Sequence, residues 1–126
     1  MATGSREGDF VLVVDDEPTV AEMATEALRE AGYRALFALD AFAGMGQLES
    51  NKDIGLLFTD IVMPGIDGFR FADMATARRP WLKVLYTTGY MGLVRELQVA
   101  GELHGQILDK PYRPAALVAA VRRALD

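Results

Sequence analysis

Six polar residues that could do chemistry stand at the ends of short apolar runs in the sequence. In chain order they are Asp15, Asp16, Asp60, Thr87, Thr88 and Lys110. Three carboxylates brought close together repel one another, so a cluster of them is costly unless a cation fills it. Oxygen ligands without histidine or cysteine favour a hard cation, Mg²⁺ or Mn²⁺, and a nearby ammonium and hydroxyl suit an anionic phosphoryl group. These residue types therefore predict phosphoryl transfer with a carboxylate as the nucleophile.

The apolar runs that carry these residues have the pattern of strands buried on both faces of a sheet. They span residues 10–14, 33–39, 54–59, 82–87 and 106–108. Apolar residues at helical spacing, with Asp, Pro or Gly near the ends, predict a helix after each run. The predicted helices span residues 18–31, 41–49, 69–79 and 93–100, and the last runs from 113 or 114 to 125.

This alternation predicts an α/β fold, a doubly wound parallel sheet of five strands with helices on both faces. Ligands of such a sheet bind beyond the carboxyl ends of its strands, which is where the six polar residues stand. The second strand ends in Asp40, but we expect that strand at the sheet edge, away from the cluster, with Asp40 capping a helix. Asp67 is expected to be a turn or cap residue, and Arg78 and Arg79 are expected on a solvated helix end.

Length and composition exclude several function classes. The 126 residues correspond to one domain, which we expect over residues 9–126 after a flexible tail at 1–8. The absence of cysteine excludes disulfides and thiol chemistry, and one histidine argues against a histidine-rich metal site. The net charge of −5 does not attract nucleic acid or anionic membranes. No apolar run approaches the roughly 18 residues that cross a membrane, and no signal peptide is evident, so we expect a cytoplasmic protein without membrane insertion.

Four motifs together resemble the receiver domain of bacterial two-component response regulators. They are Val13-Val14-Asp15-Asp16-Glu17, Asp60-Ile61-Val62-Met63-Pro64-Gly65-Ile66-Asp67-Gly68, Thr88-Gly89-Tyr90 and Lys110-Pro111-Tyr112. They occur in the order and at the spacing of that family, and the resemblance covers the chain from about Phe10 to Leu125. It implies a flavodoxin-like (βα)5 fold with strand order 2-1-3-4-5, in a stand-alone receiver or one from a hybrid histidine kinase.

The resemblance also implies a role for each residue of the cluster. Asp60 matches the phosphoacceptor, which attacks a phosphohistidine to form an acyl phosphate. Asp16 matches a direct Mg²⁺ ligand and Asp15 its partner, with the backbone carbonyl of Val62 as a further ligand; Mn²⁺ is a possible substitute.

Three more residues of the motifs have roles in the family. Thr88 matches the switch hydroxyl that turns toward the phosphoryl oxygen, and Lys110 matches the lysine that pairs with the phosphoryl group. Pro111 matches a proline that follows a cis peptide bond.

The sequence departs from the family pattern at one switch position, and two further positions bear on phosphoryl lifetime. Ile107 stands where the family has an aromatic residue that moves with the switch threonine, so that coupling is not implied here. Val62 and Tyr90 occupy positions that tune phosphoryl lifetime, and neither carries a carboxylate or amide that could position an attacking water. We therefore expect slow self-dephosphorylation. The weakly marked helix at 93–100 suggests mobility or shortening.

The leading hypothesis is a regulatory phosphoacceptor that catalyses only its own phosphorylation and dephosphorylation. A histidine kinase or histidine phosphotransfer protein is the expected donor, and a downstream protein effector or an attached domain receives the output. One alternative is a docking module with a receiver fold that is not phosphorylated. Another is a Mg²⁺-dependent phosphohydrolase with an aspartate nucleophile, but such enzymes usually have a second Asp where this chain has Val62.

Overall fold

A computed structural model describes residues 9–97 and 103–126 of the chain. Its centre is a five-stranded sheet in the order β2-β1-β3-β4-β5, in which every neighbouring pair is parallel. The predicted doubly wound sheet and its strand order are therefore confirmed. In sequence order the strands are β1 (Phe10–Val14), β2 (Arg34–Ala38), β3 (Leu56–Asp60), β4 (Lys83–Thr88) and β5 (Ile107–Asp109).

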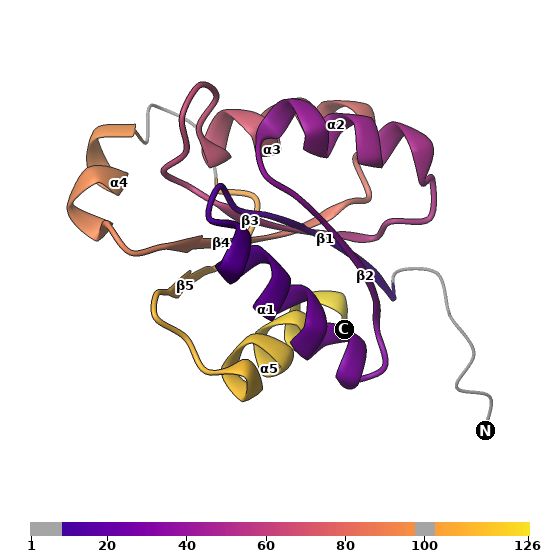
Figure 1. Cartoon of the computed structure of the whole chain (residues 1–126). Coiled ribbons are helices and arrows are strands. Elements are labelled where there is room, and N and C mark those ends of the chain that lie inside the picture. The colour runs from indigo at the N-terminus through magenta and orange to yellow at the C-terminus, as the bar shows by residue number, and fades with distance from the viewer. Residues whose placement is uncertain (1–8, 98–102) are drawn as a thin grey trace.

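Helices cover both faces of this sheet (Figure 1). They are α1 (Pro18–Glu30), α2 (Ala41–Ser50), α3 (Gly68–Arg78), α4 (Met91–Leu97) and α5 (Pro114–Leu125). Helices α1 and α5 lie on one face, whereas α2, α3 and α4 lie on the other. The strands alternate accordingly: Val11 and Val13 of β1 pack with α1 and α5, and Leu12 and Val14 pack with α2 and α3. This arrangement buries the strands from both sides, which explains their continuous apolar sequences.

Several helix boundaries follow from local signals in the sequence. The carboxylate of Asp40 accepts a hydrogen bond from the backbone N–H of Ala43 and caps α2, as expected. Asp67 caps α3 in the same way by accepting from the N–H of Arg70. Helix α1 differs, because its cap residue is Glu17 and no side chain caps it, although Pro18 occupies its first turn.

Three strands, β3, β4 and β5, end one residue further along the chain than the sequence pattern indicated. Asp60 is the last residue of β3 and pairs with Thr87 of β4, and Thr88 is the last residue of β4 and pairs with Asp109. Parallel neighbours extend these strands beyond the purely apolar run, since backbone pairing continues past the last hydrophobic side chain. Two of the predicted site residues are therefore fixed by the sheet itself.

Gly68 is needed where α3 begins, close to the end of β3. A Cβ at this position would lie 2.2 Å from the carbonyl oxygen of Asp60 and 2.8 Å from the Cα of Ile61. Only glycine lets the helix start so close to the strand, and its N–H donates to the carbonyl of Ile61 at 2.8 Å. The turn between β3 and α3 thus holds the Asp60 backbone in place.

Two expectations concern residues outside the described part of the chain. The flexible tail predicted at 1–8 lies there, as do residues 98–100 of the helix predicted over 93–100. In the described part, that helix begins two residues earlier than predicted, at Met91. None of the helices within residues 9–97 and 103–126 has the length and apolar character required to cross a membrane.

Candidate functional site

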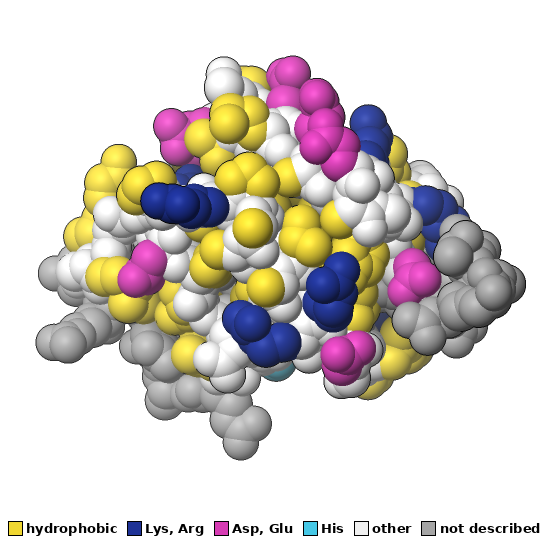
Figure 2. All heavy atoms as spheres, turned by 90° about the horizontal axis from the view of Figure 1, so that it is seen from below, with side chains coloured by type: hydrophobic (Ala, Val, Ile, Leu, Met, Phe, Trp, Pro, Cys, Tyr) yellow, Lys and Arg dark blue, Asp and Glu magenta, His cyan; other side chains and the backbone are white. Residues whose placement is uncertain are grey.

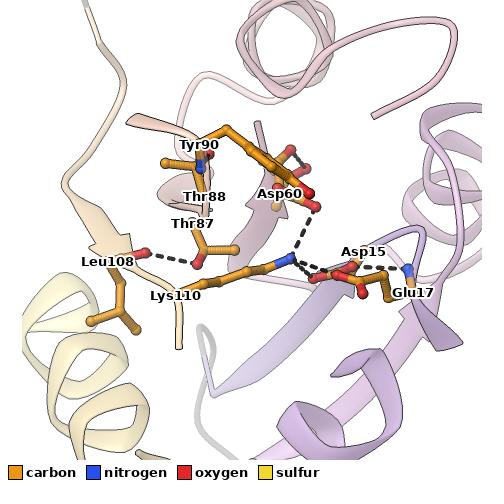
Figure 3. A network of polar contacts seen from close by, with 9 residues as sticks. Asp15, Glu17, Asp60, Thr87, Thr88, Tyr90, Leu108 and Lys110 are labelled. Atoms are coloured by element: carbon orange, nitrogen blue, oxygen red, sulfur yellow. Dashed lines mark hydrogen bonds and ion pairs between the residues drawn. The ribbon is translucent and has the colours of Figure 1, made fainter. Parts of the chain in front are cut away.

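The carboxyl edge of the sheet brings the predicted polar residues together. Asp15 directly follows β1, Asp60 ends β3, Thr88 ends β4, and Lys110 directly follows β5. Figure 3 shows the Lys110 side chain extending from the β5 end toward Asp60 and Asp15, across the space between them. Four segments that are far apart in the sequence therefore meet at one site, as the topology of a parallel sheet predicts.

Lys110 is the only ammonium among the described residues of this site, and it is shared by three acids. Its Nζ lies 2.9 Å from Oδ2 of Asp15 and 3.1 Å from Oδ2 of Asp60. The carboxylate of Glu17 is further away, at 3.4 Å, and its side chain is largely exposed. Both aspartates are buried, so their pairs with Lys110 are screened by water far less than a surface ion pair is.

Asp15, Asp16 and Asp60 form the predicted acidic cluster. Each offers one carboxylate oxygen, and these oxygens all lie within 4.8 Å of one another. The donor set consists only of oxygen, and two of the three residues are buried, so the cluster fits a hard divalent cation such as Mg²⁺. Three negative charges against the single charge of Lys110 also leave the cluster short of positive charge.

The pKa values of Asp60 and Lys110 are both raised, but for different physical reasons. Burial raises the pKa of Asp60 to about 6; the Lys110 charge opposes this shift, and the charges of Asp15 and Asp16 add to it. Burial alone would lower the pKa of Lys110, but its hydrogen bond to Asp15 and the charge of Asp60 outweigh burial and raise it above its ordinary value. Lys110 therefore remains a cation at neutral pH.

The two threonines at the end of β4 make different hydrogen bonds. The Thr88 hydroxyl accepts a hydrogen bond from the backbone N–H of Tyr90 at 2.9 Å, which leaves its own proton available to another acceptor. The Thr87 hydroxyl donates to the carbonyl oxygen of Leu108 at 2.7 Å and ties β4 to β5. Within the described residues the Thr88 hydroxyl therefore has no acceptor for its proton, whereas Thr87 has a structural role between β4 and β5.

Three other predicted residues lie around this centre. Val62 is half-buried and lies two residues beyond Asp60 in the turn before α3. Tyr90 is 63% exposed, so its ring lies at the surface. The peptide bond between Lys110 and Pro111 is cis, as the family resemblance implied.

Ile107 has an aromatic neighbour on the adjacent strand. It is half-buried and pairs in register with Tyr86 of β4, which is buried and stacks edge-to-face on Phe69 at 5.2 Å between ring centroids. The Tyr86 hydroxyl accepts a hydrogen bond from the backbone N–H of His104 at 3.3 Å. Although β5 lacks an aromatic residue at this position, β4 therefore places one beside it.

Two residues of the site were not singled out in the sequence. Glu17 contacts Lys110, and Tyr112 packs edge-to-face on Phe58 with 5.7 Å between ring centroids. Burial raises the pKa of Tyr112 to about 12, and the charge of Asp15 adds to this effect. Both residues belong to the quoted motifs, Glu17 to the first and Tyr112 to the last, but neither was assigned a role from the sequence.

One expectation from the sequence is wrong. Arg79 was expected on a solvated helix end, but it is 7% exposed. Its guanidinium donates to the carbonyl oxygens of Leu48, Asn51 and Ile54, where α2 ends and β3 approaches. Its neighbour Arg78 is exposed as expected and pairs with Glu49.

Comparisons with known proteins agree with this fold. The family model "Response regulator receiver domain" matches residues 11–122. The response regulator receiver protein CpdR of Brucella abortus is 28% identical over 115 residues, which cover 91% of this chain and 95% of CpdR. The transcriptional regulatory protein TcrA of Mycobacterium tuberculosis is 31% identical over 123 residues, which cover 96% of this chain but only 47% of TcrA.

A solved structure shows the same architecture. The response regulator receiver domain protein from Clostridium thermocellum superposes with a TM-score of 0.82 at 26% identity, over 92% of this chain and 93% of that one. Because the family model covers most of the sequence, the chain belongs to the response regulator receiver domain family. Members of this family act in two-component signalling, in which phosphorylation and Mg²⁺ binding are family features.

Proposed function

We propose that this protein is a phosphoacceptor switch and that Asp60 accepts a phosphoryl group from a phosphohistidine in a Mg²⁺-dependent reaction. One observation carries the proposal: the buried Asp60 carboxylate lies 3.1 Å from the Lys110 ammonium and within a three-aspartate cluster. A carboxylate nucleophile next to a fixed cation and a divalent-metal site is the arrangement that phosphoryl transfer requires. The donor is a histidine kinase or a histidine phosphotransfer protein.

The reaction joins one oxygen of Asp60 to the phosphorus atom of the donor. The bond between phosphorus and the histidine nitrogen breaks, the imidazole keeps the electron pair, and an acyl phosphate remains on Asp60. Asp15, Asp16, Asp60 and the carbonyl of Val62 would hold Mg²⁺, for which Mn²⁺ could substitute. When bound, the ion offsets the negative charge of the phosphoryl oxygens.

Lys110 and Thr88 act on the phosphoryl oxygens. Lys110 already spans the distance between Asp15 and Asp60, so its ammonium is positioned to neutralise an anionic group attached to Asp60. The Thr88 hydroxyl has a proton to donate, because its hydrogen bond with Tyr90 uses only its oxygen as the acceptor. A phosphoryl oxygen on Asp60 would accept this proton and draw the Thr88 hydroxyl toward Asp60. This movement would favour one conformation at the start of α4, which begins three residues after Thr88.

The role of the protein is regulatory. Phosphorylation of Asp60 shifts the populations of two conformations and thereby changes which partner binds, either a separate effector or an attached domain. The receiver unit extends over residues 9–126, and the protein acts in the cytoplasm, where the kinase domains that supply the phosphoryl group are located. Its catalysis is limited to its own phosphorylation and dephosphorylation.

A titration with beryllofluoride, which mimics a phosphoryl group on a carboxylate, tests this function. Amide NMR signals near Asp60, Thr88 and Lys110 should shift when beryllofluoride and Mg²⁺ are both present. Samples with EDTA in place of Mg²⁺ serve as the control and should not respond. An unchanged spectrum with both reagents would favour a docking module that is never phosphorylated.

The phosphoryl group on Asp60 should be long-lived. Neither Val62 nor Tyr90 can orient a water molecule by a carboxylate or amide group, so hydrolysis has no general base at these positions. We expect a half-life of minutes or longer, measured as loss of acid-labile label from the purified protein. A half-life of seconds would contradict this expectation.

A further inference from the structure

A depression opens at the amino edge of the sheet, where the strands begin, at the opposite end of β3 from Asp60. It has a volume of about 550 Å³ and lies between the α2–β3 loop, the loop before β4 and the end of α5. Its apolar lining consists of Ile54, Gly55, Trp81 and Leu125. Trp81 is 64% exposed, although a large aromatic side chain gains by burial. The fold therefore leaves a large apolar contact uncovered at this edge.

Three exposed cations surround the depression. Lys52 and Lys83 line it, and Lys83 also lines a neighbouring depression of about 510 Å³ together with Arg123 of α5. Among the described residues, none of these three cations forms an ion pair. Asp53, the one acid among the described residues that line either depression, is already paired with Arg34 at 2.6 Å. Figure 2 shows the face that carries α1 and α5, where Lys and Arg side chains stand beside hydrophobic ones and a group of acidic side chains lies along another edge.

Helix ends explain only part of this pattern. Lys52 follows the end of α2 and Arg123 stands in the last turn of α5, where the helix dipole favours a cation. Lys83 begins β4, well beyond the end of α3, so the dipole does not account for it. An exposed tryptophan surrounded by cations without partners is typical of the centre of a binding surface, where Trp and Arg are enriched.

We propose that the amino edge binds an extended acidic segment of a partner protein, in which one apolar side chain is flanked by Asp or Glu residues. The apolar side chain enters the depression beside Trp81, and the carboxylates pair with Lys52, Lys83 and Arg123. Complementary charge selects this occupant. A long polyanion such as nucleic acid is disfavoured, because the net charge of −5 repels it outside the local contact.

This surface is separate from the phosphoacceptor site, and the inference goes beyond the proposed function. Strand β3 has five residues. At about 3.3 Å per residue, the depression lies roughly 17 Å from Asp60. That separation exceeds the distance of about 8 Å over which charges act at physiological salt. The acidic segment therefore stays bound whether or not Asp60 is phosphorylated, which makes the amino edge a constitutive tether.

The fluorescence of Trp81 reports directly on the depression, because it is the only tryptophan in the sequence. Three synthetic peptides of about 12 residues serve as probes. The first has a central leucine flanked by glutamates, the second has the same leucine flanked by lysines, and the third is the acidic peptide with serine in place of leucine. We expect a blue shift of the Trp81 emission with the first peptide and about tenfold weaker binding of the other two at low salt. The preference over the lysine peptide should shrink as salt is added.

Variants identify the residues responsible. Lys83→Gln should weaken binding of the acidic leucine peptide about threefold, and replacing Lys52, Lys83 and Arg123 together by Gln should weaken it about tenfold. Arg113→Gln is the matched control, because it removes an exposed cation just before α5, at the other edge of the sheet. It should leave the affinity unchanged. Trp81→Ala, followed by amide NMR instead of fluorescence, should also weaken binding about tenfold.

Several outcomes would overturn the proposal. Equal affinity for the acidic and the lysine peptide, or an unchanged affinity in Trp81→Ala, would contradict it. A single-stranded oligonucleotide that shifts the Trp81 emission at lower concentration than the acidic peptide would make nucleic acid the occupant instead. Emission that depends on protein concentration without peptide would make a second copy of the chain the occupant.

A last titration tests the independence from phosphorylation. Beryllofluoride with Mg²⁺ should leave the affinity for the acidic leucine peptide within about twofold, since the charge change at Asp60 is screened over this distance. A tenfold change in either direction would show that the amino edge responds to the phosphoacceptor site and would overturn its role as a constitutive tether.

Discussion

Buried charges lie at both ends of β3, and they are satisfied in different ways. Before the strand begins, the guanidinium of Arg79 donates to three backbone carbonyls and ties the end of α2 to the loop that leads into β3. At the other end, Asp60 and Asp15 share the single ammonium of Lys110, and Asp16 adds another negative charge. The first arrangement is complete within the protein, whereas the second needs further positive charge.

This difference separates a structural charge from a functional one. Burial of a charged group is costly in both places, and hydrogen bonds to carbonyls offset that cost for Arg79. In the acidic cluster the cost of burying charge is only partly offset by Lys110. Burial and the neighbouring negative charges therefore raise the pKa of Asp60. A buried site that is unfavourable on its own is a candidate binding site, because a cation can relieve the repulsion.

The largest loss of stability is expected when Arg79, the buried arginine near the start of β3, is replaced. Arg79→Met leaves the carbonyls at the end of α2 without their donor, and we expect it to lower the free energy of unfolding by about 3 kcal/mol. Urea denaturation measures this change. A loss below about 0.5 kcal/mol, the size of an ordinary surface substitution, would show that Arg79 is not the structural group described here.

Replacing Asp60, at the carboxyl end of β3, should instead increase the free energy of unfolding. A pKa of about 6 in the folded protein, against an ordinary value of 3.8, means that the ionised Asp60 destabilises the fold. At pH 7 with EDTA, Asp60→Asn should raise the free energy of unfolding by up to about 3 kcal/mol.

The pH dependence of that gain follows from the same shift. Below pH 4 the carboxyl is protonated in both folded and unfolded chains, so the variant gains nothing. The gain should grow between pH 4 and pH 6, as the unfolded chain and then the folded chain lose the proton. Urea denaturation across this range measures it, and a gain that is independent of pH would contradict the electrostatic origin.

Mg²⁺ should stabilise the protein by binding the acidic cluster at the carboxyl end of β3, and replacing Arg79 should not change this effect. At a concentration ten times its dissociation constant, the ion should stabilise the wild type by about 1.4 kcal/mol. Arg79→Met should gain the same amount, because its change lies far from the cluster, and Asp60→Asn should gain much less. Thermal unfolding with and without the ion provides the measurement, and equal gains in all three proteins would mean that the ion binds elsewhere.

The smallest effect is expected at the residue next to Arg79. Arg78 pairs with Glu49 at the surface, and exposed pairs contribute little. Arg78→Met should change the free energy of unfolding by less than about 0.5 kcal/mol. The same urea experiment compares it directly with Arg79→Met, and a similar loss for both would remove the distinction between buried and exposed arginine.

The sequence predicts the site far better than it predicts the structural charge. Asp15, Asp60 and Lys110 could be placed together because each follows an apolar run, and parallel strands bring such positions to one edge. Arg78 and Arg79 look alike in the sequence, and only tertiary packing distinguishes them. The carbonyl partners of Arg79 are 25 to 31 residues away, in the last turn of α2 and in the loop after it, and no local sequence pattern indicates that these segments approach Arg79.

Pairing between adjacent strands explains the remaining differences between the predicted and the observed structure. Strands β3 and β4 extend by one residue because pairing with an adjacent strand, rather than hydrophobicity, decides where they end. Tyr86 could not be recognised as the aromatic neighbour of Ile107 without the register between β4 and β5.

Mapping the phosphoryl group after incubation with acetyl phosphate and Mg²⁺ tests the central claim most directly. We expect one acid-labile phosphoryl group per chain, located by mass spectrometry in the peptide that contains Asp60. It should be absent from Asp60→Asn and retained in Asp40→Asn, whose carboxylate caps α2 away from the site. Acid-labile label that persists in Asp60→Asn, or that maps to another residue, would contradict the account.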